Sequence, residues 1–131
     1  MTESQFQTKF NQWLMNIQFE HSFAAELKVT KKHYIAFSAV KQHQLNALWQ
    51  VKHRRFAYKI SDISLGLKPF DSFFFYKTPA YVVILYYKGP RKINTAYIID
   101  IDRFLDEMKT SKRKSLLEHR AMAIAYKMFN I

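Results

Sequence analysis

The stretch FAAELKV, residues 23–29, places two charged side chains inside a short apolar run. A run of this length and composition predicts a β-strand. Side chains alternate between the two faces of a strand, so Glu26 and Lys28 point to one face and Leu27 points to the other. A carboxylate and an ammonium group therefore lie one pleat apart on the same surface of the predicted strand.

The composition around this strand predicts one compact domain spanning residues 1–131. Nearly half of the residues are hydrophobic, and only two Gly and three Pro are present, which leaves little room for long linkers. No stretch reaches the ~18 uncharged apolar residues that a membrane span needs. The chain has no Cys and no export leader, so we expect no disulfide, no thiolate zinc site and a cytoplasmic protein.

Charge is the strongest compositional signal. The 21 Lys and Arg outnumber the 10 Asp and Glu, which gives a formal charge of +11. Such an excess attracts polyanions, although a basic protein without an anionic partner is the alternative. Because the basic residues are clustered between predicted strands, we interpret them as the border of a DNA path. The residues predicted to contact nucleic acid are Lys31, Lys32, His43, Lys52, Arg54, Arg55, Lys68, Arg91, Lys92, Lys112, Arg113 and Lys114.

Hydrophobic periodicity predicts a mixed α/β (α+β) chain. Two apolar stretches, 70–76 and 80–87, are separated by Lys-Thr-Pro and are interpreted as a hairpin. Ser115 and Glu118 form a capping-box pattern that predicts the start of the last helix. The other predicted elements are helices at about 3–16, at about 38–52 and from Asp102, with strands at 23–29, 56–60 and 96–101.

A second carboxylate, Asp71, begins another apolar stretch. If its strand end lies beside that of Glu26, the two carboxylates can bind one Mg²⁺ ion, which needs only one or two protein carboxylates besides water and phosphate. The metal could then polarise a phosphate and acidify a water molecule. Lys28 could orient that water or stabilise charge on the phosphate. Glu3 and Asp62 are alternative candidates for a further metal ligand.

Gln44 is a polar residue on the apolar stripe of the second predicted helix, together with Val40, Leu48 and Val51. A glutamine on an apolar face needs a hydrogen-bond partner. We expect Gln44 to support a water molecule or a phosphate near the metal. His43 is expected to contact a phosphate rather than the metal, because no second histidine lies at ligand spacing.

These motifs together resemble the PD-(D/E)xK nuclease superfamily. The triplet ELK at 26–28 is followed by FS at 37–38 and HQL at 43–45, as in Holliday junction resolvases of the RecU type. KPFD at 68–71 resembles the metal-binding aspartate segment, and the pattern over about residues 3–125 is similar to small phage resolvase-like proteins. In the superfamily the aspartate strand precedes the ExK strand, whereas here it follows, so the resemblance implies a circularly permuted core.

The resemblance implies a restriction-endonuclease-like fold, in which helices flank a mixed β-sheet. It also implies a Mg²⁺-dependent endonuclease, with Mn²⁺ as a substitute, that cleaves branched DNA such as a four-way junction. Such an enzyme would act as a homodimer in phage DNA recombination, repair or processing, in the cytoplasm of an infected bacterium. Two alternatives stay open: a non-catalytic basic DNA-binding module of the same fold, and a structural or partner-binding phage protein.

Overall fold

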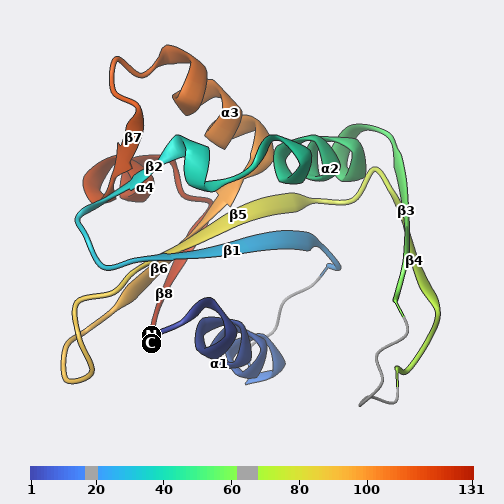
Figure 1. The fold of residues 1–131 in the computed structure, drawn as a ribbon, viewed down its shortest axis with the longest axis horizontal. Coiled ribbons are helices and arrows are strands. Elements are labelled where there is room, and N and C mark those ends of the chain that lie inside the picture. Colours follow the sequence, from blue (N-terminus) through green and yellow to red (C-terminus); the bar gives the residue numbers. More distant parts are fainter. Residues whose placement is uncertain (17–20, 62–67) are drawn as a thin grey trace.

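A four-stranded mixed β-sheet lies at the centre of the structure (Figure 1). The computed structural model describes residues 1–16, 21–61 and 68–131. Within this part of the chain the strand order is β1-β5-β6-β8. β1 and β5 run parallel, and the other two pairs are antiparallel. The bounds are Ala24–Thr30 for β1, Ala80–Tyr86 for β5, Thr95–Asp100 for β6 and Lys127–Asn130 for β8.

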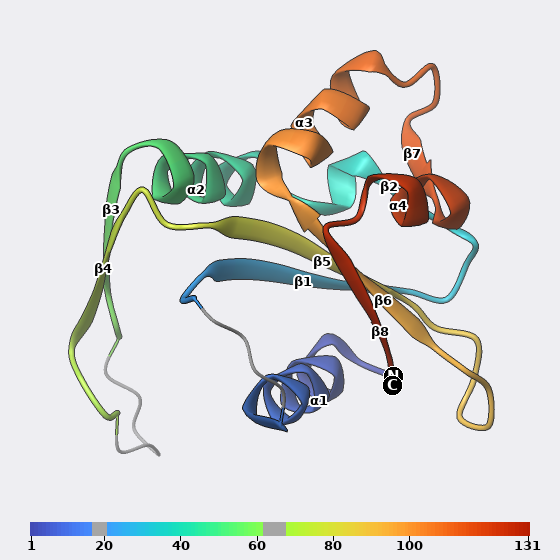
Figure 2. The same cartoon turned by 180° about the vertical axis from the view of Figure 1, so that it is seen from behind.

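Helices cover both faces of this sheet (Figures 1 and 2). α1 (Glu3–Asn16) packs on one face, whereas α2 (Gln42–His53), α3 (Ile101–Thr110) and α4 (Glu118–Ile124) pack on the other. The predicted mixture of helices and strands is therefore confirmed.

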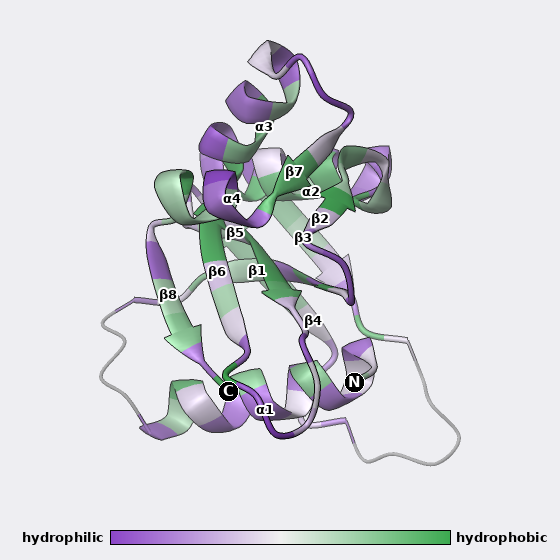
Figure 3. Ribbon diagram, turned by 90° about the vertical axis from the view of Figure 1, so that its left-hand side faces the viewer, coloured by the Kyte–Doolittle hydropathy of each residue, from purple (hydrophilic) through white to green (hydrophobic). Residues whose placement is uncertain are grey.

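Strand β5 supplies the core of both layers. All of its residues are buried. Val82 and Ile84 pack with the α2 side, whereas Val83 and Leu85 pack with the α1 side. An uninterrupted apolar run is what a strand covered on both faces requires. Figure 3 shows the hydrophobic colour on β5 and on the neighbouring part of β6.

Two small antiparallel sheets flank the central one. β2 (Tyr34–Ala36) pairs with β7 (Ser115–Leu117), and a short 3₁₀ turn, η1 (Phe37–Ala39), leads from β2 toward α2. β3 (Arg55–Lys59) pairs with β4 (Ser72–Tyr76). The β3–β4 hairpin projects from the end of α2, outside the central sheet (Figure 1).

The predicted pairing of residues 70–76 with residues 80–87 is wrong. β4 pairs with β3 instead, and β5 pairs with β1. The backbone N–H groups of Lys77 and Thr78 donate to carbonyls at the end of α2 (3.1 and 2.8 Å). Lys77 also has a left-handed φ of 46°. These contacts hold the connection against α2, so β4 and β5 leave it in different directions.

The predicted start of the last helix at Ser115 is also wrong. Ser115 belongs to β7, and α4 begins at Glu118. A capping box needs the Glu118 side chain to turn back toward the backbone. Here Glu118 Oε2 accepts a hydrogen bond from the Tyr97 hydroxyl (2.8 Å), and Oε1 pairs with Lys88 Nζ (3.2 Å). Burial, together with the bond to Glu118, raises the pKa of Tyr97 to about 12.

A charged cluster joins the end of α2 to the start of α3. Lys52 Nζ lies 2.8 Å from Asp100 Oδ1 and 2.6 Å from Asp102 Oδ2, and His53 Nε2 lies 2.9 Å from Asp102. Asp100, rather than Asp102, caps α3, because its side chain accepts the Asp102 N–H (3.0 Å). Burial alone raises the pKa of Asp102, but its bonds to Lys52 and His53 outweigh burial and lower that pKa.

We expect Asp102→Asn to destabilise the fold by about 0.5–1 kcal/mol at neutral pH, since the pairs are partly exposed. A carboxyl group whose pKa is lower in the folded state stabilises that state at pH values above its unfolded-state pKa of about 3.9. This stabilisation is lost as the pH falls through the folded-state pKa. Urea unfolding of both proteins, from neutral pH down to about pH 2, measures the difference. The difference in stability between the two proteins should vanish in acid. Asp106→Asn, on the same helix but outside these ion pairs, is the matched control.

Candidate active site at the edge of the central sheet

β1 forms one edge of the central sheet in the described part of the chain. Leu27 packs into the core on the α1 side. Glu26 points to the opposite face, where it meets a side chain of α2. Lys28 contacts Glu26 and therefore shares that face. The alternation predicted for the three residues is confirmed.

Four side chains from three elements meet at this edge; we call them the edge cluster: Glu3, Glu26, Lys28 and Gln44. Lys28 Nζ lies 3.2 Å from Glu26 Oε1 and 3.8 Å from Glu3 Oε1. Gln44 Nε2 donates to Glu26 Oε1 (3.0 Å). The α1 residue therefore meets a strand face that α2 covers, because β1 is the edge strand and α1 can reach around it.

Gln44 is held at both ends of its amide. Its Oε1 accepts the backbone N–H of Lys41 (3.0 Å), which otherwise lacks a partner at the start of α2. Its Nε2 is thereby directed toward Glu26. The sequence predicted that Gln44 supports a water molecule or a phosphate near the metal; in the structure its amide N–H bonds the Glu26 carboxylate. Gln44 can position Glu26, whereas its amide oxygen is already engaged.

The cluster opens toward α1. The Lys28 side chain is only 12% exposed and that of Glu26 is 27% exposed, whereas that of Glu3 is 57% exposed. A cavity of about 140 Å³ lies at the Glu3 side and is lined by Glu3, Gln7, Ala25, Glu26 and Leu27. Both carboxylates therefore border one small polar space, while Lys28 lies behind them.

The donor atoms at this cavity suit magnesium. Glu3 and Glu26 offer carboxylate oxygens and Gln7 offers an amide oxygen, and Mg²⁺ prefers a few such ligands completed by water and phosphate. Across residues 1–16, 21–61 and 68–131, no three His, Asp or Glu side chains gather closely enough to bind a metal alone. The residues thus fit a two-carboxylate site that relies on water and substrate for the other ligands.

The placement of Asp71 differs from the expectation. Asp71 was expected to be the second metal ligand if its strand end lay beside that of Glu26, but β4 pairs with β3, and β1 pairs with β5. The Asp71 side chain is 88% exposed on the hairpin, where it forms an ion pair with Lys68 (3.1 Å). The two strands are therefore not paired with each other, and a metal role for Asp71 stays a prediction. Asp62 lies outside the described residues.

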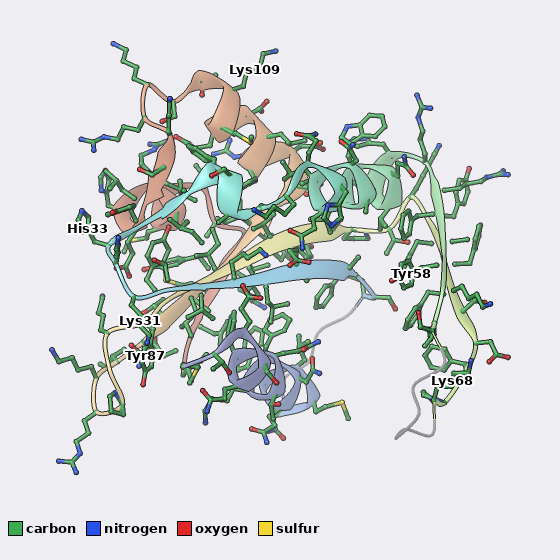
Figure 4. The ribbon with its side chains drawn as sticks, viewed as in Figure 1. Lys31, His33, Tyr58, Lys68, Tyr87 and Lys109 are labelled. Atoms are coloured by element: carbon green, nitrogen blue, oxygen red, sulfur yellow. The ribbon has the colours of Figure 1, made fainter. Side chains whose placement is uncertain are left out.

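The predicted nucleic-acid contacts fall into separate groups rather than one path. Lys31 and Lys32 follow β1, and Arg91 and Lys92 lie in the turn after β5, at the same end of two parallel strands. Figure 4 shows Lys31 close to Tyr87 there, in keeping with the hydrogen bond from Tyr87 N–H to the Thr30 carbonyl (2.8 Å). A third group lies between α3 and β7, namely Lys112, Arg113 and Lys114.

The remaining predicted contacts lie near α2 and the hairpin. Exposed His43 is next to Gln44 on α2. Arg54 stacks over Trp49, and Arg55 stacks over Tyr76. The Lys52 ammonium group is already paired with Asp100 and Asp102. It is therefore not free to make the DNA contact that the sequence predicted.

Gln7 is a polar residue of this cavity that the sequence did not assign to the site. It follows Glu3 by four residues on α1, and such a spacing brings two side chains to one face of a helix. This spacing is the signal that could have identified it.

Comparisons with known proteins leave the geometry of the edge cluster as the main guide to function. No protein-family model, no curated protein and no solved structure matches the chain. In the described residues, no helix has both the length and the apolar character that crossing a bilayer demands.

Proposed function

We propose that this chain is a Mg²⁺-dependent endonuclease that cleaves branched DNA, with the edge cluster as its active site. The supporting observation is the contact of Glu3, Glu26, Lys28 and Gln44 with one another at the edge of the sheet, beside a cavity that both carboxylates line. A carboxylate pair beside a lysine is equipment for phosphodiester hydrolysis. Glu26, Lys28 and Gln44 also belong to the segments that resemble PD-(D/E)xK nucleases, whereas the KPFD segment of that resemblance lies on the hairpin.

In this proposal, Glu26 and Glu3 would hold the metal. When bound, the ion supplies Lewis acidity toward a phosphate oxygen and makes a bound water more acidic. Lys28 remains behind the carboxylates, where its ammonium group can orient the attacking water or stabilise charge on the phosphate. Gln44 keeps the Glu26 carboxylate in one orientation through its hydrogen bond.

The substrate and assembly follow from charge and from the motifs. A net charge of +11 favours binding to nucleic acid. The preference for four-way junctions, the restriction-endonuclease-like permuted core, the homodimer and the role in phage recombination come from the motif resemblance. A homodimer would provide the paired cuts that a four-way junction needs.

A non-catalytic DNA-binding module is the second candidate. Two observations favour it: Asp71 lies on the hairpin with Lys68 as its partner, and Lys28 neutralises the Glu26 carboxylate. Such a module would bind DNA in a salt-sensitive manner without cleaving it.

We expect Glu26→Gln to reduce Mg²⁺-dependent cleavage of a four-way junction by at least about 100-fold, because it removes a metal ligand. Junction binding in Ca²⁺ should change little, since no phosphate contact is lost. The measurements are nicking of a labelled junction and of a matched duplex, with and without Mg²⁺. Asp106→Asn, which alters an acid outside the cluster, should retain full activity. Mg²⁺-dependent cleavage that persists in Glu26→Gln would exclude this active site.

We expect Gln44→Ala to raise the Mg²⁺ concentration for half-maximal cleavage by about 10-fold or more, the usual cost of losing a group that orients a metal ligand. Junction affinity measured in Ca²⁺-free buffer should remain within about twofold, because Gln44 bonds Glu26 and not DNA. A magnesium titration of the cleavage rate measures this effect. An unchanged magnesium midpoint together with slower cleavage would contradict the positioning role.

A further inference from the structure

A large apolar cavity lies beside the edge cluster. We call it the aromatic groove: a space of about 710 Å³ between the β3–β4 hairpin on one side and α1 with the start of β1 on the other. In Figures 1 and 2 the hairpin extends from the end of α2 beyond the level of β1, and α1 lies on that same far side of β1. The volume falls within the range of about 300–1,000 Å³ that is typical of ligand-binding pockets.

The hairpin wall of the groove consists of four aromatic rings. Phe56 faces Phe75 across the two strands, and Tyr58 faces Phe73. Rings along each strand are nearly parallel: Phe56 and Tyr58 are 6.3 Å apart with an 11° interplanar angle, and Phe73 and Phe75 are 6.0 Å apart with a 15° angle. Tyr58 is 57% exposed and Phe73 is 41% exposed. The wall therefore offers partly exposed aromatic rings in two rows.

The opposite wall is apolar with two amide groups. Phe10, Leu14 and Leu27 supply the apolar surface. Gln7 and Asn11 lie one helical turn apart on α1 and also line the groove. Each amide can donate and accept hydrogen bonds. Flat apolar surfaces with a few such groups suit a planar ligand that has hydrogen-bonding edges.

The groove is continuous with the edge cluster. Gln7, Ala25 and Leu27 line both the groove and the small cavity that holds the Glu3 and Glu26 carboxylates. A ligand that occupies the small cavity with one group can therefore extend its neighbouring group into the groove.

The charge of the hairpin favours an anionic ligand. Arg55 and Lys59 lie on its outer face, and exposed Arg54 and Lys77 lie at its root. Asp71 is the sole acidic residue in the described segments 54–61 and 68–77. Cations around a concave apolar surface raise the local concentration of a polyanion that can also stack on aromatic rings.

We propose that the aromatic groove binds unpaired nucleobases of the DNA strand that adjoins the scissile phosphate. The bases stack on the rings of Phe56, Tyr58, Phe73 and Phe75, and their edges meet the amides of Gln7 and Asn11. The inference rests on the proposed function for the position of the phosphate. It specifies the substrate class: branched DNA with single-stranded nucleotides at the branch, in preference to continuous duplex.

The test compares two faces of one strand. Phe73→Leu and Phe75→Leu, singly and combined, keep apolar bulk but remove aromatic rings that line the groove. Phe74→Leu is the matched control, because Phe74 lies between them on the outer face and is 67% exposed. Fluorescence anisotropy with a labelled oligothymidylate and with a matched duplex, both in Ca²⁺ at one salt concentration, measures affinity.

We expect the combined groove variant to lose about 10-fold or more in affinity for the single strand, with little change for the duplex. Phe74→Leu should bind the single strand as the unaltered protein does. A 2-aminopurine base in the oligonucleotide should be quenched by the unaltered protein and much less by the groove variant, a signal that a purely structural role does not produce.

The inference would be overturned if Phe74→Leu lost as much affinity for the single strand as the groove variant, or if the groove variant lost none. In that case the groove is better explained as a surface that the hairpin itself or a second copy of the chain closes. Sedimentation of the groove variant distinguishes these two cases, because only the second changes the oligomeric state. Binding is measured without cleavage, so it is separable from the proposed activity. If the protein quenches 2-aminopurine but does not cleave DNA, base binding in the aromatic groove is supported and the proposed endonuclease activity is refuted.

Discussion

The parallel pairing of β1 with β5 is the constraint on which the rest of the structure depends. It sets Glu26 opposite Val82 and Lys28 opposite Ile84. β5 is covered by helices on both faces, so its neighbour β1 also lies between the two helical layers. Because parallel strands need a long crossover, the chain between them has room for both α2 and the hairpin.

The edge position of β1 makes a charged cluster compatible with this fold. A lysine whose side chain is 12% exposed needs a carboxylate partner, since burial of an unpaired charge is costly. Glu26 provides that partner from the same strand, and Glu3 approaches from α1 around the open edge. In an inner strand such as β5, the same side chains would face helices on both sides without access to solvent.

The β3–β4 hairpin has the opposite character. A two-stranded sheet has too little surface to bury its side chains, and a hairpin of this size is marginal in water without further packing. Tyr58, Phe70, Phe74 and Tyr76 accordingly remain exposed. The bonds of Lys77 and Thr78 to the end of α2 anchor its root. A ligand in the aromatic groove would cover part of this exposed apolar area.

The sequence by itself determined the features that depend on local spacing. Glu26 and Lys28 share a face because strand alternation is built into the backbone, and Gln44 needed a partner because it lies on an apolar helical stripe. Only the tertiary structure decided which strands pair, that Glu3 rather than Asp71 approaches Lys28, and that Glu118 bonds Tyr97 instead of capping its helix. Those outcomes depend on contacts between residues far apart in the chain, whose competing pairings local sequence patterns do not rank.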